Sequence, residues 1–264
     1  MRVVAVLAVR NERPYLANHL THLIANGLDY LIIDNESDDG SAELLSEPSF
    51  ARHLAGYRRH PFSGAFDWSG LIVAAEAAIA EIDADWVILL APDEWPHPYA
   101  PQETLHDAIA RIGAAGHDVI DFNEFVFLPI EHDYVADRPG PQPLHWYYFF
   151  EPKSRRLLRA RRTSLEVSWV KGGGHSLDGD KFNLAPETFA LRHYIVRSQE
   201  HAFGKYAERR FRQDELDRGW HRQRVGRNRD RFTFPPTAEL DFLENPESRD
   251  LSRARPRTEH YWDW

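Results

Sequence analysis

The chain has 264 residues, of which 42% are apolar and 28% charged, and carries a formal net charge of −9 at pH 7. This length allows one large α/β domain with a sizeable core, and the negative charge argues against nucleic acid as a partner. The sequence has no cysteine, which excludes disulfides and thiolate metal ligands, and no apolar run approaches the roughly 18 residues of a membrane span. We therefore expect a cytoplasmic protein without a transmembrane segment.

The first half of the sequence alternates predicted strands and helices with short connections. Continuous β-branched runs are typical of strands buried on both faces, and one-sided or alanine-rich apolar spacing indicates helices. The predicted strands are 2–9, 30–34, 54–58 and 85–90, and the predicted helices are 11–27 and 66–82. This order favours an α/β fold with a doubly wound, mostly parallel sheet flanked by helices.

The second half is less regular. Its predicted elements are a helix at 102–115, strands at 118–128, 144–151 and 187–196, and a helix at 198–216 capped by Ser198. We predict a domain over 1–215, with a nucleotide-binding half (1–95) and an acceptor half (96–215). Residues 216–264 form an Arg- and Pro-rich extension that packs on the domain or is partly ordered.

Polar side chains follow three of the predicted strands, at the edge of a doubly wound sheet where ligands bind. They are Asn11 and Glu12, then Asp34 and Asn35, then Asp93 and Glu94. The sequence has neither a GxGxxG after the first strand nor a GxxxxGK[ST] loop. Phosphates would therefore be held by basic side chains or through a divalent cation, Mn²⁺ or Mg²⁺.

Several segments, in order along residues 3–206, resemble family-two glycosyltransferases with the GT-A fold, in a bacterial branch. "AVRNE" (8–12) resembles the end of their first strand, and "IIDNESDDGS" (32–41) resembles their D-x-x-S-x-D-G-[ST] element. "DWVILLAPDEW" (85–95) resembles the strand that carries their paired-aspartate motif. "GGGHSL" and "LRHYIVRSQEHAFGKY" resemble later segments of that branch.

The resemblance implies transfer of a sugar from a nucleotide diphosphate, such as a UDP- or GDP-sugar, to an acceptor hydroxyl, with inversion. Asn11, Glu12, Asp34 and Asn35 would hold the nucleoside. Asp67 is a weaker candidate for the same role, because it also stands where a helix N-cap is expected. For Ser37 and Asp39 in the same loop, the alternative is a network of caps that only orders the loop.

The resemblance also implies a metal site, with one departure. Ala91 stands where the first acid of the motif is expected, so Asp93 remains as the direct metal ligand and Glu94 is a structural or supporting acid. His175 and His193 are candidates for further ligands or for diphosphate contacts. The loss of the first acid is compatible with a weaker metal site and with a metal-independent enzyme.

Charge and proton transfer need further residues. Lys153, Arg197 and Lys205 are candidates to neutralise the departing diphosphate. The general base would be Asp178 or Asp180 if it comes from the glycine-rich loop. It would be Glu124 or Asp121 if it comes from the edge of the sheet.

The predicted setting is cytoplasmic assembly of a surface polysaccharide or glycolipid, with the inner face of the membrane as one predicted location. Nine arginines lie between Arg209 and Arg231. They form either a solvated, ion-paired helix face or a basic face for an anionic acceptor, a diphosphate or a lipid head group. A sugar-nucleotide-binding pseudoenzyme is the rival suggested by Ala91. A sugar nucleotidyltransferase is disfavoured, because "AVRNERPY" contains no glycine.

Overall fold

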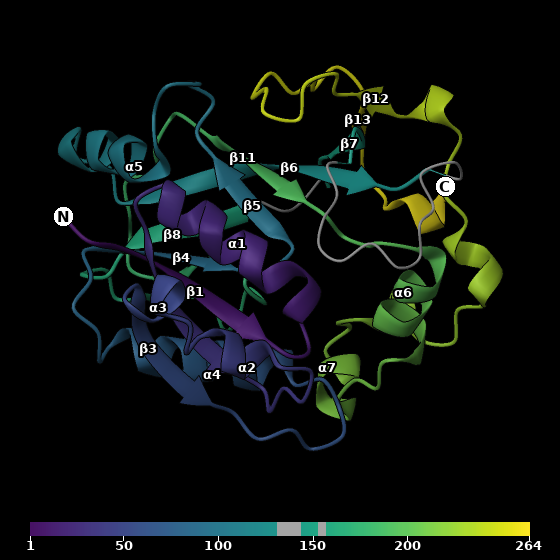
Figure 1. Cartoon of the computed structure of the whole chain (residues 1–264), viewed down its shortest axis with the longest axis horizontal. Coiled ribbons are helices and arrows are strands. Elements are labelled where there is room, and N and C mark those ends of the chain that lie inside the picture. The colour runs from purple at the N-terminus through teal and green to yellow at the C-terminus, as the bar shows by residue number, and fades with distance from the viewer. Residues whose placement is uncertain (131–143, 153–156) are drawn as a thin grey trace.

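The computed structural model describes residues 1–130, 144–152 and 157–264. A large mixed sheet runs through the molecule in the order β12-β7-β6-β8-β4-β1-β2-β3, and helices cover it (Figure 1). The predicted α/β class is confirmed. Strands β1 (Val3–Val9), β2 (Asp29–Asp34), β3 (Leu54–Arg59) and β4 (Trp86–Leu90) are mutually parallel neighbours.

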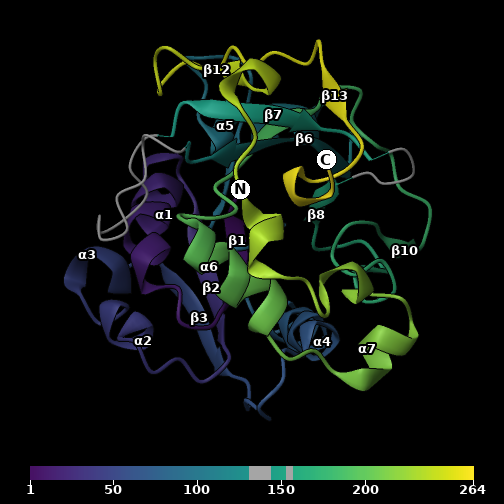
Figure 2. The ribbon, with the colours of Figure 1, turned by 90° about the vertical axis from the view of Figure 1, so that its right-hand side faces the viewer.

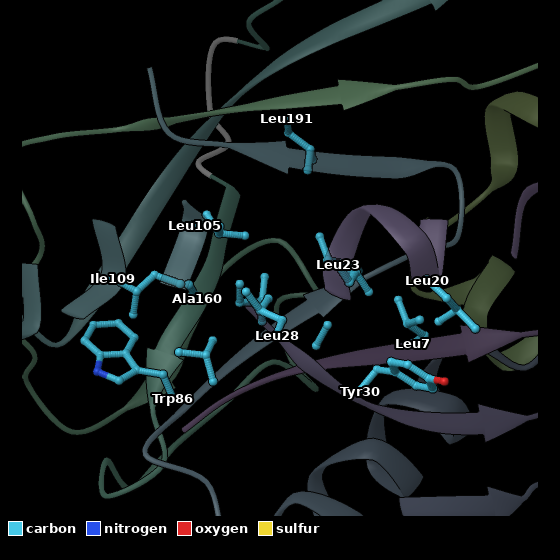
Figure 3. Close-up of a cluster of buried hydrophobic side chains, with 14 of the residues drawn as sticks. Leu7, Leu20, Leu23, Leu28, Tyr30, Trp86, Leu105, Ile109, Ala160 and Leu191 are labelled. Atoms are coloured by element: carbon cyan, nitrogen blue, oxygen red, sulfur yellow. The ribbon is translucent and has the colours of Figure 1, made fainter. Parts of the chain in front are cut away.

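Two helices pack on opposite faces of this parallel part. Helix α1 (Arg13–Ala25) contributes leucines to a core with the odd-numbered residues of β1, and Figure 3 shows Leu20 and Leu23 beside Leu7. Helix α4 (Trp68–Ile79) packs against Val4 and Val6 on the other face. Successive strand residues point to opposite faces, so both faces of β1 are buried, as its continuous apolar run predicts.

The connections in this half are short. Two one-turn helices, α2 (Ser41–Leu44) and α3 (Pro48–Ala51), link β2 to β3. Helix α5 (Leu105–Ala114) begins at Thr104, whose side chain accepts a hydrogen bond from the backbone N–H of Asp107. Because β1 to β4 run parallel, their carboxyl ends meet at one edge of the sheet.

Antiparallel pairing enters the sheet with β8 (Leu157–Arg162), which lies between β4 and β6 (Val119–Leu128). Strand β7 (Trp146–Phe150) pairs antiparallel with β6, and β11 (Phe189–His193) pairs parallel with it. The short strand β5 (Glu94–His97) pairs antiparallel with β11. Our sequence analysis did not predict β5 or β8.

Strand β8 escapes prediction because it is rich in arginine, yet two of its arginines are buried. Arg159 Nη2 contacts Glu94 Oε1 at 2.7 Å, and Arg161 Nη2 contacts Glu76 Oε2 at 2.5 Å while its guanidinium lies over the Trp169 ring. A buried charge is tolerated when it is paired and hydrogen-bonded, and both partners come from distant parts of the chain.

The helix predicted at 198–216 is divided. It forms α6 (Gln199–Phe203), a π-helical turn (Gly204–Glu208) and α7 (Gln213–Asp217), with extended backbone between the last two. The backbone at 210 and 212 hydrogen-bonds with Phe66, which draws this segment toward the start of α4. Ser198 caps α6 as predicted, by accepting a hydrogen bond from the backbone N–H of His201.

The C-terminal residues pack on the second half of the sheet. Strands β12 (Asp241–Phe242) and β13 (Pro256–Arg257) pair with β7, and Tyr261 and Trp262 are buried in an aromatic cluster with Tyr206. Two strands of two residues each, β9 (Val167–Ser168) and β10 (Asp178–Gly179), pair antiparallel apart from the large sheet. Within the described ranges, no helix has the length and apolar character needed to cross a bilayer.

Candidate active site

A pocket of about 570 Å³ opens where β1 and β4 end. In Figure 1 the arrow of β1 points toward α6 and α7, and in Figure 2 the chain around α6 lies in front of β1. The wall combines the strand ends (8–12 and 91–94), the loop before α4, parts of β8 and β11, and the π-helical turn. Its side chains include Asn11, Glu12, Phe66, Trp68, Asp93, Glu94, Arg159, His175, His193, Lys205, Glu208, Arg209, Arg210, His221 and Arg224.

A chain of alternating charges lies at the end of β4. Asp93 Oδ2 accepts a hydrogen bond from Lys205 Nζ and lies 3.4 Å from His193 Nε2. The other ring nitrogen of His193, Nδ1, is 2.6 Å from Glu124 Oε1. Lys205 Nζ also donates to the backbone carbonyl of Ile195 at 3.0 Å. Residues from β4, β6, β11 and the π-helical turn are thereby joined into one unit.

In this unit, the charged partners taken together shift the pKa values further than burial does. Burial alone would raise the pKa of Asp93, but Lys205 and His193 hold it well below its usual range. Burial alone would lower the pKa of His193, but Asp93 and Glu124 raise it well above its ordinary value, and Asp93 likewise raises that of Lys205. The contacts therefore favour the ionised forms of all four side chains.

Glu94 is engaged differently from its neighbour. It is 4% exposed, its Oε1 accepts from Arg159, and its Oε2 accepts from the backbone N–H of Ala91 at 2.8 Å. Arg159 in turn donates to the carbonyl of Gly174 at 3.0 Å, in the glycine-rich loop. Glu94 thus ties the turn after β4 to β8 and to that loop.

The donor set at this edge does not fit a divalent cation. Ala91 offers no side-chain oxygen, both oxygens of Glu94 are engaged, and Asp93 faces two cations. Of the residues described here, no His, Asp or Glu side chains come together in a group of three that could hold a metal. Asp93, His175 and His193 line one pocket, but they do not form a metal-binding cluster in this structure.

The nucleotide side of the pocket contains two of the predicted residues. Asn11 has a left-handed φ of 55°, and its side chain exchanges hydrogen bonds with Asp38. Glu12 is half-buried beside Asp93 and Lys205. Loss of hydration raises its pKa to about 7, with Lys205 acting in the opposite sense.

Asp34 and Asn35 lie beneath the pocket rather than in its wall. Asp34 accepts from the Tyr57 hydroxyl at 2.8 Å and from the backbone N–H of Ser37 at 3.1 Å. Asn35 donates to the carbonyls of His60 and Pro61. Both side chains are buried, and their contacts shape the loop after β2.

The remaining predicted residues are dispersed. Asp67 caps α4, accepting from the backbone N–H of Gly70 at 2.9 Å. Arg197 lies over the Tyr15 ring, outside the pocket wall. Asp178 is exposed and 2.6 Å from Lys171 Nζ, and Asp180 is exposed at the end of the same loop. Lys153 lies outside the described residues.

Several wall residues were not foreseen. The aromatic side chains of Phe62 and Phe66, in the loop before α4, and of Trp68, the first residue of α4, line the pocket. The Arg10 guanidinium lies 3.4 Å from the centre of the Phe62 ring. The signal for them was present in "FSGAFDW", which has unusually many aromatics for a loop. Glu208 gave no signal of its own, because its segment was predicted as a uniform helix. Arg209, Arg210 and Arg224 lie in the arginine-rich stretch for which a basic, anion-binding face was one of the two interpretations.

The family model described as Glycosyl transferase family 2 matches residues 4–166. The chain belongs to this family. The match spans β1 to β8 and includes the ends of β1, β2 and β4. No curated protein matches the sequence.

Solved structures with a similar course of the chain are distant in sequence. TarS of S. aureus is 14% identical, covers 74% of this chain and has a TM-score of 0.43; this chain spans 37% of its length. The structure of TarS residues 1–349 with UDP-GlcNAc is 14% identical in sequence and has a TM-score of 0.42. The match covers 76% of this chain and 60% of that chain. Mannosyltransferase PcManGT from Pyrobaculum calidifontis, with GDP-Man and Mn²⁺, is 14% identical over 49% of this chain and 36% of its own, with a TM-score of 0.33.

Proposed function

We propose that this family-two protein transfers a sugar from a nucleotide diphosphate to an acceptor hydroxyl, with inversion, in the pocket at the ends of β1 and β4. The observation that carries the proposal is the Asp93–Lys205–His193 unit, which lies in a pocket of about 570 Å³ with an acidic and a basic wall. This volume is within the usual range of pockets that bind small molecules and cofactors.

The nucleoside is assigned to the β1 side of the pocket. Asn11 and Glu12 would contact it directly, and a flat base has aromatic surfaces available at Phe62 and Phe66. Asp34 and Asn35 would act from below, by fixing the loop that carries Asn11's partner Asp38. Asp67 would hold the start of α4, next to Trp68.

The diphosphate is assigned to the π-helical turn. Lys205 lines the pocket from this turn, and Arg209, Arg210 and Arg224 line it from the segment that follows. An anion gains most from cations in a partly dehydrated site. Arg197, which lies outside the pocket wall, would add to the positive potential at the diphosphate. In the transfer, the acceptor oxygen forms a bond to the anomeric carbon, and the bond from that carbon to the diphosphate oxygen breaks with its electron pair going to the diphosphate.

The acceptor hydroxyl must also lose a proton to a base. Glu124 is hydrogen-bonded to His193 and Asp178 is paired with Lys171, so each would need to change partners to serve. Asp180 would need the glycine-rich loop to close. Glu12 lines the pocket with a pKa near 7, which suits proton transfer at neutral pH, and we add it to these candidates.

The arginine-rich segment supports two roles within one setting. Arg212, Arg218, Arg227 and Arg229 pair with acidic side chains, as a solvated face would. Arg209, Arg210 and Arg224 instead face the pocket. We propose a cytoplasmic role in assembling a surface polysaccharide or glycolipid, with the second group of arginines serving the anionic donor.

Donor hydrolysis tests the proposal against a sugar-nucleotide-binding pseudoenzyme, the rival that Ala91 favours. Wild type and Asp93→Ala are incubated with UDP- and GDP-sugars, and release of UDP or GDP is measured. We expect slow release that Asp93→Ala abolishes and that Asp230→Ala, at an exposed aspartate outside the pocket, retains. Equal background release from all three proteins would support the pseudoenzyme.

A further inference from the structure

We infer that the ammonium group of Lys205 takes the place of a divalent cation at Asp93, so that the diphosphate is bound without metal. The inference rests on the proposed function and specifies how its donor is held. It starts from a disagreement: the family resemblance implies a metal site, and the residues at the end of β4 do not fit one.

The first support is the contact geometry of Asp93. Its side chain is 4% exposed, and Oδ2, the oxygen nearest the pocket cations, contacts both Lys205 Nζ and His193 Nε2. A metal ion at this oxygen would have to displace a hydrogen-bonded ammonium and lie beside a second positive charge. The cost of that repulsion is high in a buried site.

The second support is the balance of charge. Two acidic side chains, Asp93 and Glu124, alternate with two basic side chains, Lys205 and His193, so each carboxyl group already has a basic partner within the protein before any ligand enters. A site with aspartates at both 91 and 93 would be more negative and would need a cation. Ala91 removes that need.

The third support is the donor capacity of Lys205. An ammonium group has three N–H donors, and the described contacts use one for Asp93 and one for the carbonyl of Ile195. The remaining N–H is available to a diphosphate oxygen, because Lys205 lines the pocket. The π-helical turn that carries it begins at Gly204, also in the wall, and brings Arg209 to the same side.

Lys205 then acts when the donor bond breaks. The bond between the anomeric carbon and the diphosphate oxygen breaks, its electron pair stays on that oxygen, and the new negative charge is met by the Lys205 ammonium. The acceptor oxygen forms the new bond to the anomeric carbon, and its proton passes to the base. His193 and Glu124 are positioning residues, because they hold Asp93 and through it Lys205.

Calorimetric titration of the whole chain with UDP and with GDP, in EDTA and in MnCl₂, tests the inference. We expect one of the nucleotides to bind with a Kd that differs less than about threefold between the two buffers. Binding that requires MnCl₂, or becomes tenfold tighter with it, would overturn the inference and leave the proposed function intact. Absence of binding in both buffers would instead refute the proposed function.

Variants locate the effect. Lys205→Met should weaken nucleotide binding in EDTA roughly 10- to 100-fold, the usual size for a charge-assisted hydrogen bond to phosphate. Lys181→Met, at an exposed lysine outside the pocket, is the matched control and should bind like wild type. Because Lys205→Met takes the hydrogen-bonded ammonium away from the buried Asp93 and leaves it only the contact with His193, a second variant is needed. The double variant Asp93→Asn/Lys205→Met, which removes both the carboxylate and the ammonium, should fold and show the same loss. Wild-type affinity in that double variant would overturn the inference.

A gain of metal binding completes the test. Wild type titrated with MnCl₂ alone should show no saturable binding that depends on Asp93. The variant Ala91→Asp/Lys205→Ala restores the missing acid and removes the ammonium, and it should bind Mn²⁺ and make nucleotide binding at least tenfold tighter in MnCl₂ than in EDTA. Saturable, Asp93-dependent binding of Mn²⁺ by wild type would contradict the inference.

Discussion

The ends of β2 and β4 offer a comparison within one sheet edge. Each carries a buried aspartate, Asp34 or Asp93, less than 5% exposed. Asp34 is satisfied by neutral donors, a tyrosine hydroxyl and a backbone N–H, whereas Asp93 is satisfied by two cations that line the pocket. The difference shows that the partners of a strand-end acid indicate its role. Neutral donors tie Asp34 into the loop, and the basic side chains that line the pocket support the role proposed for Asp93 in holding the donor.

The largest expected effect comes from removing Asp93, the carboxylate that contacts two basic side chains. Asp93→Ala leaves Lys205 and His193 without their shared carboxylate in a buried place, and we expect a loss of about 3–5 kcal/mol in the free energy of unfolding. Donor turnover should also fall below detection. Urea denaturation and nucleotide release measure the two effects. A variant as stable as wild type would mean that water replaces the carboxylate.

Removing Asp34, the carboxylate with neutral hydrogen-bond donors, should reduce stability less and should preserve donor turnover. Asp34→Ala removes the acceptor for Tyr57 and for the backbone N–H of Ser37, so we expect about 1–3 kcal/mol of lost stability. Nucleotide affinity should weaken, while the donor turnover at saturation stays within a few fold of wild type. A loss of turnover equal to that of Asp93→Ala would erase the distinction between the two strand ends.

Glu12, at the end of β1, should make the stability of the fold depend on pH. Its raised pKa means that the folded chain holds a proton between about pH 4.5 and 7 that the unfolded chain releases, so this group lowers stability as pH rises through that window. Glu12→Gln should therefore be more stable than wild type at pH 8, by roughly 1–2 kcal/mol, and equal to it near pH 4. Thermal unfolding at both pH values measures the difference, and equal shifts at both would contradict the raised pKa.

Asp67 gives the smallest effect. Its carboxylate caps α4, and replacing a capping aspartate by alanine costs about 1 kcal/mol. Asp67→Ala should lower the melting temperature slightly and leave Kd for UDP or GDP within about threefold of wild type. A larger loss of affinity would show that Asp67 contacts the nucleotide.

The parallel half was open to prediction because each part of it is specified locally. The runs at 3–9, 30–34 and 86–90 are apolar on both faces, and α1 and α4 show their helical spacing in the sequence itself. The second half depends on distant partners. The arginine-rich strand β8 can be buried because Glu94 and Glu76 form ion pairs with its arginines.

The same reason divides the candidate site. The fold class, the family resemblance and the edge at which Asn11, Glu12 and Asp93 meet could be predicted, because strand order places those residues together. The pairing of Lys205 with Asp93, the contact between Glu124 and His193, and the role of Asp34 in its loop emerged only from the folded chain. Partner choice for a buried charge depends on segments far apart in the chain, and no local pattern of residues records it.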